Sequence, residues 1–356
     1  MGHRRRNRGR LARFAHASGV PRAAAPVLTR VFKDPEVWRL ELPMGETFLP
    51  SVNVFVVRDG ADTLIVDTAT PDAGNDVRLL GALRRLGVDL RRATLFCTHA
   101  HVDHAGQARL LVDAGVRMCA TPTTLRDMVR FSTTEYLDFM VRRMEGEGTP
   151  AAEARDLAGA IWSYNVSFDA RRTPCATVEP GGKIACGRWL FEVVATPGHA
   201  PGHTMLWLPE RGMAFTGDTV LFACSACISF WEGEADSLGD QMDTLRRMAD
   251  MGIEHAFLGH GLQEGDLGER CLANLEHHQA RSARALAAVG ERPGASGFEL
   301  VSALGWRVDF ERWEDLPALT RWFLVSGSIA HLDHLVACGS VRREADAAGV
   351  NRYWLA

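Results

Sequence analysis

The chain has no long apolar run and no strong charge of one sign. Hydrophobic residues make up 46% of its 356 residues, yet no apolar stretch reaches the roughly 18 residues that a membrane-spanning helix needs. The net charge of -4 gives no overall attraction to nucleic acid or to an anionic membrane. These absences predict an ordinary soluble protein without a membrane partner, long enough for a sizeable core and a second small domain.

The sequence also lacks the regular cysteine spacing of a disulfide framework. Its eight cysteines are scattered, which favours free thiols in a reducing compartment and therefore a cytoplasmic location. Cys224 and Cys227 form a C-x-x-C pair, which is compatible with a redox couple or a metal site. No second pair completes a zinc knuckle, so we interpret this segment as a plain loop and leave the redox and metal roles open. The eight positions are Cys97, Cys119, Cys175, Cys186, Cys224, Cys227, Cys271 and Cys338.

A serine nucleophile and a secretory signal are also missing. No G-x-S-x-G motif is present, so the sequence does not indicate a serine hydrolase of the α/β type. Met1 to Phe14 contains six arginines and no acid, without the apolar segment of a secretory signal. We expect residues 1–28 to form a disordered basic tail, and the alternative is a targeting or nucleic-acid-binding arm.

The most informative feature that is present is a string of metal-binding side chains from Thr98 to His104. It contains His99, His101, Asp103 and His104 directly after a short apolar strand at 95–97. Burying four such groups is costly unless something pairs with them. Neutral imidazoles and carboxylates are the ligands of zinc sites that keep a position open for water.

Further polar side chains follow other apolar segments. Strands are predicted at 193–196, 214–217 and 256–258, followed by His199, Asp218 and His260. A fifth strand at 64–66 ends in Asp67. Open α/β sheets place their chemistry at the carboxyl ends of strands, so we expect these side chains to meet.

These five segments, in this order, resemble the metallo-β-lactamase superfamily over roughly residues 30–265. The resemblance implies an α/β (α+β) fold of four layers, αββα, with a binuclear site along one edge. By position, His99, His101 and His199 resemble the ligands of the first metal, and Asp103, His104 and His260 those of the second. Asp218 resembles the carboxylate that bridges both metals, and Asp67 the outer acid that steadies the ligand loop.

The ligand types bear on the metal and the reaction. A flavin-linked di-iron branch of the superfamily has a carboxylate where this chain has His101. The histidine favours a metal that supports hydrolysis over one that supports redox chemistry. We therefore expect two Zn²⁺ ions, with iron or manganese as the alternatives. Two metals that share a water lower its pKa towards about 7 and give a hydroxide nucleophile. Asp103 and Asp218 are then the catalytic carboxylates, and Asp67 supports them from outside. His203 is expected to form local hydrogen bonds rather than bind metal.

Two regions outside the motifs carry further expectations. An insertion at about 121–170 is predicted to hold two or three helices, divided near residues 146–150. Its aromatic residues are expected to form core, and the alternative is a lid over an apolar substituent of the substrate. The aromatic and sulfur-containing residues concerned are Phe131, Tyr136, Phe139, Met140, Trp162 and Tyr164.

The catalytic domain is therefore predicted at 29–268 and a second domain at 269–356. Helices at 267–289, 298–304 and 316–338 followed by a hairpin at 340–355 resemble a winged-helix domain found in one branch of these hydrolases. Its few arginines, including Arg342 and Arg343, are interrupted by acids, which disfavours DNA binding. We expect this domain to be a wall of the active site or a contact in a homodimer. His331 and His334 are expected to be packing or surface residues.

Three functions remain open at this point. The preferred one is hydrolysis of a thioester, ester or lactone of a small molecule, which fits the apolar insertion and the acidic charge. An endoribonuclease acting on single-stranded RNA is the alternative, and the sequence shows no basic groove for it. A DNA-binding regulator that uses the C-terminal domain is disfavoured by the intact ligand set. The sequence does not identify the substrate.

Overall fold

The computed structural model describes residues 27–45, 49–71, 74–163, 173–308 and 312–356. The predicted basic tail lies outside these residues except for Val27 and Leu28, which begin the first strand instead. Tyr164, one of the predicted insertion aromatics, also lies outside them. Within the described residues, no helix is both long and apolar enough to span a membrane.

A seven-stranded mixed sheet forms the first half of the fold. Its strands lie in sequence order, antiparallel from the first to the fourth and parallel from the fourth to the seventh. Parallel pairing requires crossovers, which helices and long loops supply here. The strands are β1 (Val27–Phe32), β2 (Glu36–Pro43), β3 (Ser51–Asp59), β4 (Asp62–Val66), β5 (Ala93–Phe96), β6 (Arg117–Ala120) and β7 (Cys175–Thr177).

A five-stranded sheet packs against the first. Its order is β12-β11-β10-β9-β8, antiparallel except for the parallel pair of β11 and β12. The strands are β8 (Lys183–Cys186), β9 (Trp189–Ala195), β10 (Thr204–Leu208), β11 (Met213–Gly217) and β12 (His255–Leu258). Phe55 of β3 lies 5.4 Å from Phe215 of β11 and 5.3 Å from Phe257 of β12, ring centroid to centroid, so aromatic packing joins the two sheets.

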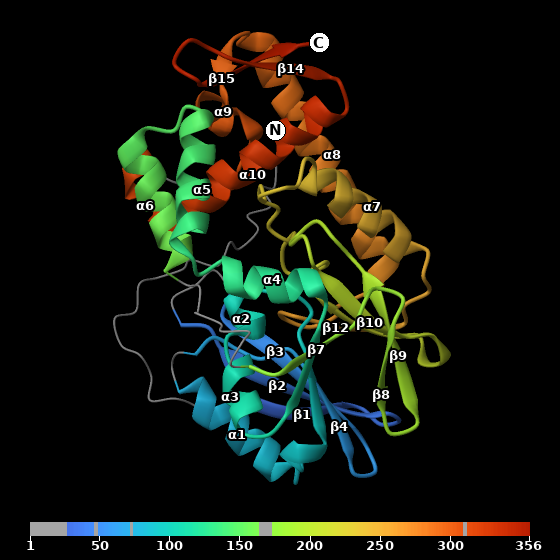
Figure 1. Cartoon of the computed structure of the whole chain (residues 1–356). Coiled ribbons are helices and arrows are strands. Elements are labelled where there is room, and N and C mark those ends of the chain that lie inside the picture. The colour runs from blue at the N-terminus through green and yellow to red at the C-terminus, as the bar shows by residue number, and fades with distance from the viewer. Residues whose placement is uncertain (1–26, 46–48, 72–73, 164–172, 309–311) are drawn as a thin grey trace, which may run out of the picture.

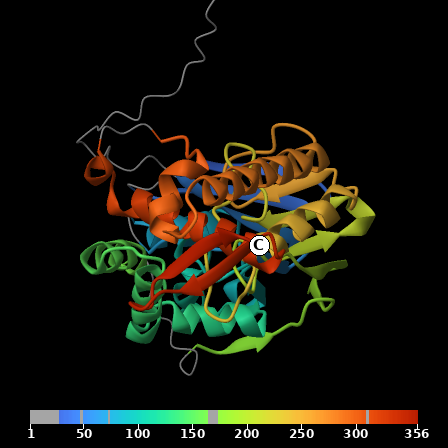
Figure 2. The ribbon, with the colours of Figure 1, turned by 90° about the horizontal axis from the view of Figure 1, so that it is seen from above.

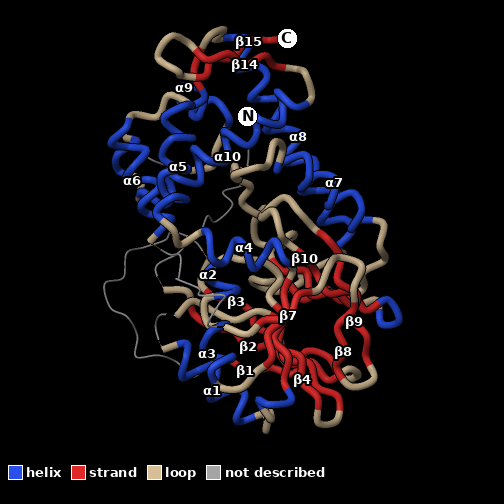
Figure 3. Tube along the Cα trace, viewed as in Figure 1, coloured by secondary structure: helices blue, strands red, loops and turns tan. Residues whose placement is uncertain are grey.

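Helices cover the outer faces of both sheets, as Figures 1 and 3 show. Leu79 and Leu83 of α1 (Asn75–Arg85) and Leu111 of α3 (Ala108–Asp113) share one buried cluster with the first sheet. On the other side, α7 (Ser237–Ala249) and the start of α8 (Leu267–Glu291) share a cluster with β10 to β12. The predicted four-layer αββα fold is therefore confirmed.

The predicted insertion contains three helices, α4 (Pro122–Arg130), α5 (Thr134–Gly146) and α6 (Ala151–Trp162). Thr121 and Thr133 cap the first two by accepting hydrogen bonds from backbone amides. Phe131, Tyr136 and Met140 are buried in the core, whereas Phe139 is only half-buried. Of the four predicted aromatic residues that the structure describes, Phe131 and Tyr136 are core as expected, and Phe139 and Trp162 are partly buried against it.

The C-terminal region has helices and a small sheet. After α8 come β13 (Ala295–Ser296), α9 (Gly297–Leu300), α10 (Ala318–Ala337) and the hairpin of β14 (Val341–Ala345) and β15 (Asn351–Leu355). Figure 2 shows this hairpin above the rest of the chain, with α8 and α10 side by side beneath it. The remaining elements are α2 (Val102–Ala105) and the short 3-10 helices η1 (Leu90–Arg92), η2 (Pro209–Arg211), η3 (Val301–Leu304) and η4 (Trp313–Asp315).

The order helix, helix, helix, hairpin agrees with the predicted order of elements. The assignment of this region as a winged-helix domain stays a prediction, and so does the division at residue 268. Residue 268 lies in the first turn of α8. Asp266 caps this helix by accepting a hydrogen bond from the Glu269 amide, and the helix then runs on to Glu291.

Candidate metal centre

The predicted ligands all follow the carboxyl ends of strands that share one edge of the sandwich. Asp67 follows β4, and His99 follows the parallel neighbour β5. In the second sheet, β9 and β11 both run antiparallel to β10, and β12 runs parallel to β11. His199, Asp218 and His260 therefore emerge at the same edge, as the strand pattern predicted.

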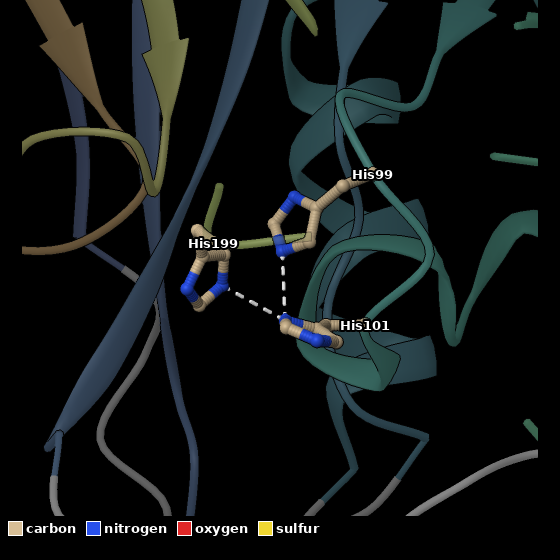
Figure 4. A group of neighbouring side chains, drawn as sticks. All are labelled: His99, His101 and His199. Atoms are coloured by element: carbon tan, nitrogen blue, oxygen red, sulfur yellow. Dashed lines mark hydrogen bonds between the residues drawn. The ribbon is translucent and has the colours of Figure 1, made fainter. Parts of the chain in front are cut away.

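The first group of ligands is formed by His99, His101 and His199. Nδ1 of His101 lies 3.0 Å from Nε2 of His99 and 2.9 Å from Nε2 of His199. Figure 4 shows the three rings turned towards one another. Three imidazole nitrogens thus surround one point, which is the donor set of a zinc-type site with an open position.

The second group is formed by Asp103, His104, Asp218 and His260. Nε2 of His260 lies 3.3 Å from Oδ2 of Asp103 and 3.2 Å from Oδ2 of Asp218. Nε2 of His104 lies 3.3 Å from Oδ1 of Asp218. Two carboxylates and two imidazoles therefore meet here.

Asp218 joins the two groups. Its Oδ2, which contacts His260, also lies 3.7 Å from Nε2 of His199 in the first group. Its Oδ1 is buried and lies 3.3 Å from Nε2 of His104, but no hydrogen bond of good geometry to it forms among the described residues. A buried carboxylate oxygen that is poorly satisfied is costly, so this atom fits a metal ligand better than a structural hydrogen-bond acceptor. Asp218 therefore contacts both groups, and its role as the bridging ligand stays a prediction.

The protonation of four of the histidines follows from their outer contacts. Nδ1 of His199 lies 2.7 Å from the Cys227 carbonyl oxygen, and Nδ1 of His260 lies 2.7 Å from the Ser51 carbonyl oxygen. A carbonyl only accepts, so each Nδ1 carries the proton and each Nε2 turns a lone pair into the site. Metal-binding histidines in proteins are held in this way.

His104 and His99 are fixed through Asp67. Nδ1 of His104 lies 2.8 Å from Oδ2 of Asp67, which accepts its proton. The Thr98 hydroxyl donates to the same oxygen at 2.8 Å, so it accepts from Nδ1 of His99 at 3.0 Å. In the neutral form of both histidines Nε2 carries a lone pair. Each of these nitrogens lies about 3 Å from a ring nitrogen of another histidine, His101 or His260. Such an arrangement is stable when a cation lies between the nitrogens, so the residues fit two metal ions.

Asp67 also holds the loop that carries these ligands. Its Oδ1 accepts a hydrogen bond from the Thr98 amide at 2.7 Å. Its backbone has φ of 63°, the only positive value among the described non-glycine residues. Asp and Asn tolerate this conformation better than most residues, so the position combines an uncommon turn with an acid.

Burial keeps the first group of histidines neutral. In the second group, burial is outweighed by the nearby carboxylates, which raise the pKa of His104 well above its usual value and that of His260 to about 10, so a metal would displace protons there. Burial, together with the neighbouring imidazoles, lowers the pKa of His99 well below its usual value. Burial and His199 lower the pKa of His101 to about 3. Although burial raises the pKa of Asp218, the charges of His260 and His104 hold it well below the ordinary range. Neutral imidazoles beside an ionised carboxylate are the states that bind metal.

His203 lies beside the centre but in neither ligand group. Its Nδ1 lies 2.7 Å from the Thr196 hydroxyl, and its Nε2 accepts from the Asp218 amide at 3.1 Å. It therefore holds the backbone of Asp218, in agreement with the expected local role. His334 lies 2.9 Å from Asp236, and His331 is buried against the Ser282 hydroxyl.

Several supporting residues had no signal in the sequence motifs. Asn53 donates to the carbonyls of Leu258 and Gly261, which fixes the turn that carries His260. At Gly259, a Cβ would lie only 2.1 Å from Oδ1 of Asp218, so only glycine fits there. Because Asn53 lies in β3, more than 200 residues from these carbonyls, the contact becomes visible only in the folded chain.

The C-x-x-C segment contributes through its backbone. Cys227 supplies the carbonyl that orients His199, and burial and Cys224 raise the pKa of the Cys227 thiol to about 12. Neither cysteine belongs to a metal-binding group among the residues that the structure describes. The loop interpretation agrees with this arrangement.

Comparison with known proteins agrees with this geometry. The family model described as "Metallo-beta-lactamase superfamily" matches residues 48–116 and 133–260. The chain belongs to the metallo-β-lactamase superfamily. It is 25% identical over 284 residues to the lactamase-like protein adaB of Aspergillus niger, covering 68% of this chain and 86% of that protein. The chain is also 35% identical over 94 residues to a hydroxyacylglutathione hydrolase of Rhodospirillum rubrum, covering 26% of this chain and 35% of the relative.

A solved structure extends the similarity of fold to the C-terminal region. The β-lactamase domain protein of Burkholderia ambifaria superimposes with a TM-score of 0.77 at 24% identity, covering 96% of this chain and 97% of that one. The family and the two ligand groups together identify this superfamily member as a hydrolase with a binuclear metal site.

Proposed function

We propose that this hydrolase cleaves a thioester, ester or lactone of a small molecule with an apolar acyl group, using two Zn²⁺. The observation that carries the proposal is an aromatic wall directly beside the first ligand group. The rings of Trp231 and Phe131 lie 5.6 and 6.3 Å from the ring of His101, centroid to centroid. The two rings stack on each other at 5.4 Å. An apolar acyl group is desolvated by such a surface.

A cavity continues from this wall away from the metal centre. It has a volume of about 340 Å³ and lies between the insertion, the loop after β11 and the C-terminal region. Its volume is within the range of small-molecule sites. Nε1 of Trp231 is buried there without a hydrogen-bond partner among the described residues, so the ring contributes mainly its apolar face. The lining is apolar at Phe139, Phe230, Trp231, Ala235, Val336 and Ala337, and it is charged at Arg143, Glu234, Asp333 and Arg343.

Different groups of the site supply different parts of the proposed reaction. Metal ions held by the two ligand groups would supply a water of lowered pKa, about 7, and would polarise the scissile carbonyl. Asp218 and the imidazoles hold the two charges close together, and the aromatic wall excludes bulk water from the acyl group. The Asp103 side chain is 15% exposed, against 8% for Asp218. Asp103 is thus the carboxylate better placed to exchange a proton with solvent and pass it to the leaving group.

A relative supports the thioester class. The Rhodospirillum rubrum protein is named a hydroxyacylglutathione hydrolase, and its named substrate is a thioester. Zinc is the metal proposed because a three-imidazole group beside a carboxylate pair suits it and leaves a position for water.

The test is turnover of a panel of acyl thioesters of increasing chain length, in parallel with single-stranded RNA, by the zinc-loaded protein. His99→Ala serves as the blank. Thioester cleavage that is absent from the blank, and improves from acetyl to longer acyl groups, is the expected result. RNA cleavage without thioester cleavage contradicts the proposal and favours the endoribonuclease alternative.

A further inference from the structure

One face of α8 carries a row of polar and cationic side chains away from the ligand groups. Asn274, His277, His278, Arg281 and Arg284 follow one another at intervals of one, three or four residues, so they share one side of the helix. The neighbouring α10 faces this region with His331, which is buried and whose ring centroid lies 6.0 Å from that of His278. We call His277, His278, Arg281, Arg284 and Arg307 the α8 cluster.

Arg281 at the centre of the α8 cluster has no anionic partner. The residue is 8% exposed, and within the described part of the chain it forms neither a salt bridge nor a hydrogen bond. Its Nε is buried without an acceptor. The guanidinium lies 3.9 Å from the centroid of the Trp306 ring, a cation–π contact that supplies no counter-charge. A buried charge without a counter-charge is strongly unfavourable.

Other largely buried arginines of the chain are paired with carboxylates. Arg143 binds Glu147 and Asp333, and Arg321 binds Glu153 and Asp156. The fold therefore supplies acids to buried guanidinium groups elsewhere. Arg78 also has a buried nitrogen without a partner, but its side chain is only half-buried, so among the described residues Arg281 is the more deeply buried arginine without an acid.

His278 next to Arg281 shows the same lack of partners. It is 3% exposed, and neither ring nitrogen has a hydrogen-bond partner among the described residues. Nδ2 of Asn274 is also buried and unpartnered. Three neighbouring side chains of α8 thus have polar atoms that the described residues leave unused, which is uncommon in a native structure.

The charges that act on these groups are of one sign. Burial, with Arg284 and Arg307, lowers the pKa of Arg281 to about 10, and only the Cys227 thiol acts in the opposite direction. Burial, with His277 and Arg281, lowers the pKa of His278 to about 3. No acidic side chain of the described residues contributes to either pKa. The α8 cluster therefore carries positive charge and is suited to binding an anion.

The α8 cluster is linked to the metal centre by the loop at 225–228. The Ser225 hydroxyl donates to Oδ1 of Asn274 at 3.0 Å, and the Cys227 carbonyl orients His199. One short loop therefore contacts both sites. The Cys227 thiol also acts on the pKa of Arg281, so the same loop lies close to the guanidinium.

We propose that the α8 cluster binds an oxyanion, a phosphate or carboxylate, on the leaving group of the substrate, with Arg281 as its main contact. The planar guanidinium presents paired donors that match such oxyanions. The assignment of the anion to the leaving group rests on the proposed function. The existence of the anion site does not, because it follows from the unpaired donors alone.

The first experiment measures the site without turnover. Inorganic phosphate is titrated into the metal-loaded protein by calorimetry at low ionic strength, for wild type, Arg281→Gln and Arg292→Gln. Arg292 is an exposed arginine at the end of the same helix, so it controls for the loss of one charge. Any phosphate bound at the metals is common to all three proteins.

We expect binding that Arg281→Gln weakens at least about tenfold, as the loss of a charged hydrogen bond predicts, and that Arg292→Gln retains. Phosphate should also raise the Tm of wild type more than that of Arg281→Gln. Equal binding by all three proteins, or no binding, overturns the proposal. Should Arg281→Gln fail to fold, His278→Gln replaces it with the same expected direction.

The second experiment identifies the source of the anion. One acyl group is offered on coenzyme A, which carries phosphates, on glutathione, which carries carboxylates, and on N-acetylcysteamine, which is neutral. Arg281→Gln should raise KM for one charged thioester about tenfold and leave the kcat/KM of the neutral one unchanged. An equal effect on all three contradicts a leaving-group site. Absence of turnover with all of them contradicts the proposed function, while the phosphate titration still decides the anion site.

Discussion

The carboxylate of Asp67 lies 2.8 Å from Nδ1 of His104, although 37 residues separate the two in the sequence. The parallel pairing of β4 and β5 brings them together, because it places the carboxyl ends of both strands side by side. Asp67 thereby sets which nitrogen of His104 is protonated and, through the hydroxyl of Thr98, does the same for His99. One carboxylate outside the metal centre thus prepares a ligand in each group.

Replacing Asp67 by Asn should weaken metal binding without unfolding the protein. Asn has nearly the same shape and tolerates the positive φ. Its side chain has one accepting oxygen instead of two, so it cannot accept the hydrogen bonds that both carboxylate oxygens of Asp67 accept. We expect affinity for the metals to fall about 10- to 100-fold, which is typical for loss of such an outer partner. Competition with a chromophoric chelator measures it, and Asp243→Asn on the exposed side of α7 is the control. Unchanged affinity would mean that Asp67 only shapes the turn.

Replacing Asp218 by Ala should abolish turnover. The substitution removes the one carboxylate that contacts both ligand groups, and the loss of metal-dependent stabilisation of several kcal/mol lowers kcat/KM by about a thousandfold or more. Far-UV circular dichroism should stay close to that of wild type, because the side chain supports no core packing. Asp243→Ala should keep full activity. A variant at Asp218 with near-wild-type turnover is incompatible with the binuclear mechanism.

Removing the ring of Trp231 should discriminate between substrates. Trp231→Ala should lower kcat/KM about tenfold for thioesters of long acyl groups, since roughly 1.5 kcal/mol of apolar burial is lost, and much less for acetyl thioesters. Trp231→Phe should have a small effect, because Nε1 makes no hydrogen bond with the described residues. Steady-state kinetics across chain lengths measures this, with Trp354→Ala in the C-terminal hairpin as the control. An equal loss for all chain lengths argues against an acyl wall.

The buried histidine on α8 should make stability depend on pH. The pKa of His278 is about 3 in the folded protein and about 6.5 in an unfolded chain. As the pH falls below about 6.5, the unfolded chain therefore binds a proton that the folded protein does not, and stability decreases towards about pH 3. His278→Gln should make this decrease shallower, by up to about 1.4 kcal/mol per pH unit. Urea unfolding in phosphate-free buffer measures the two slopes, and identical slopes contradict the assignment.

The ligand-bearing part of the site could be predicted because its signals are local. The string from Thr98 to His104 contains four ligands in one turn, and each remaining ligand directly follows an apolar strand. Several strands that each end in His or Asp within one chain are typical of a shared metal site. For that reason the seven side chains could be named from the sequence, whereas their division into two groups and the bridging position of Asp218 were implied by the resemblance to the metallo-β-lactamase superfamily; the structure brings all seven together.

The supporting contacts could not be predicted, because they depend on backbone atoms and on distant strands. The carbonyls of Ser51 and Cys227 orient two ligands, but every residue has a carbonyl and nothing in the sequence distinguishes these. The unpaired state of Arg281 is equally hidden, since helical spacing shows which side chains share a face but not which acids are missing opposite them.

The central claim, two metal ions held by seven side chains, is tested most directly by counting metal. Elemental analysis of the purified protein should give two equivalents of metal per chain for wild type. Chelation should remove both the metal and the hydrolytic activity, and Zn²⁺ should restore them together. One equivalent or none in the reconstituted protein, or activity that survives complete removal of metal, would contradict the account.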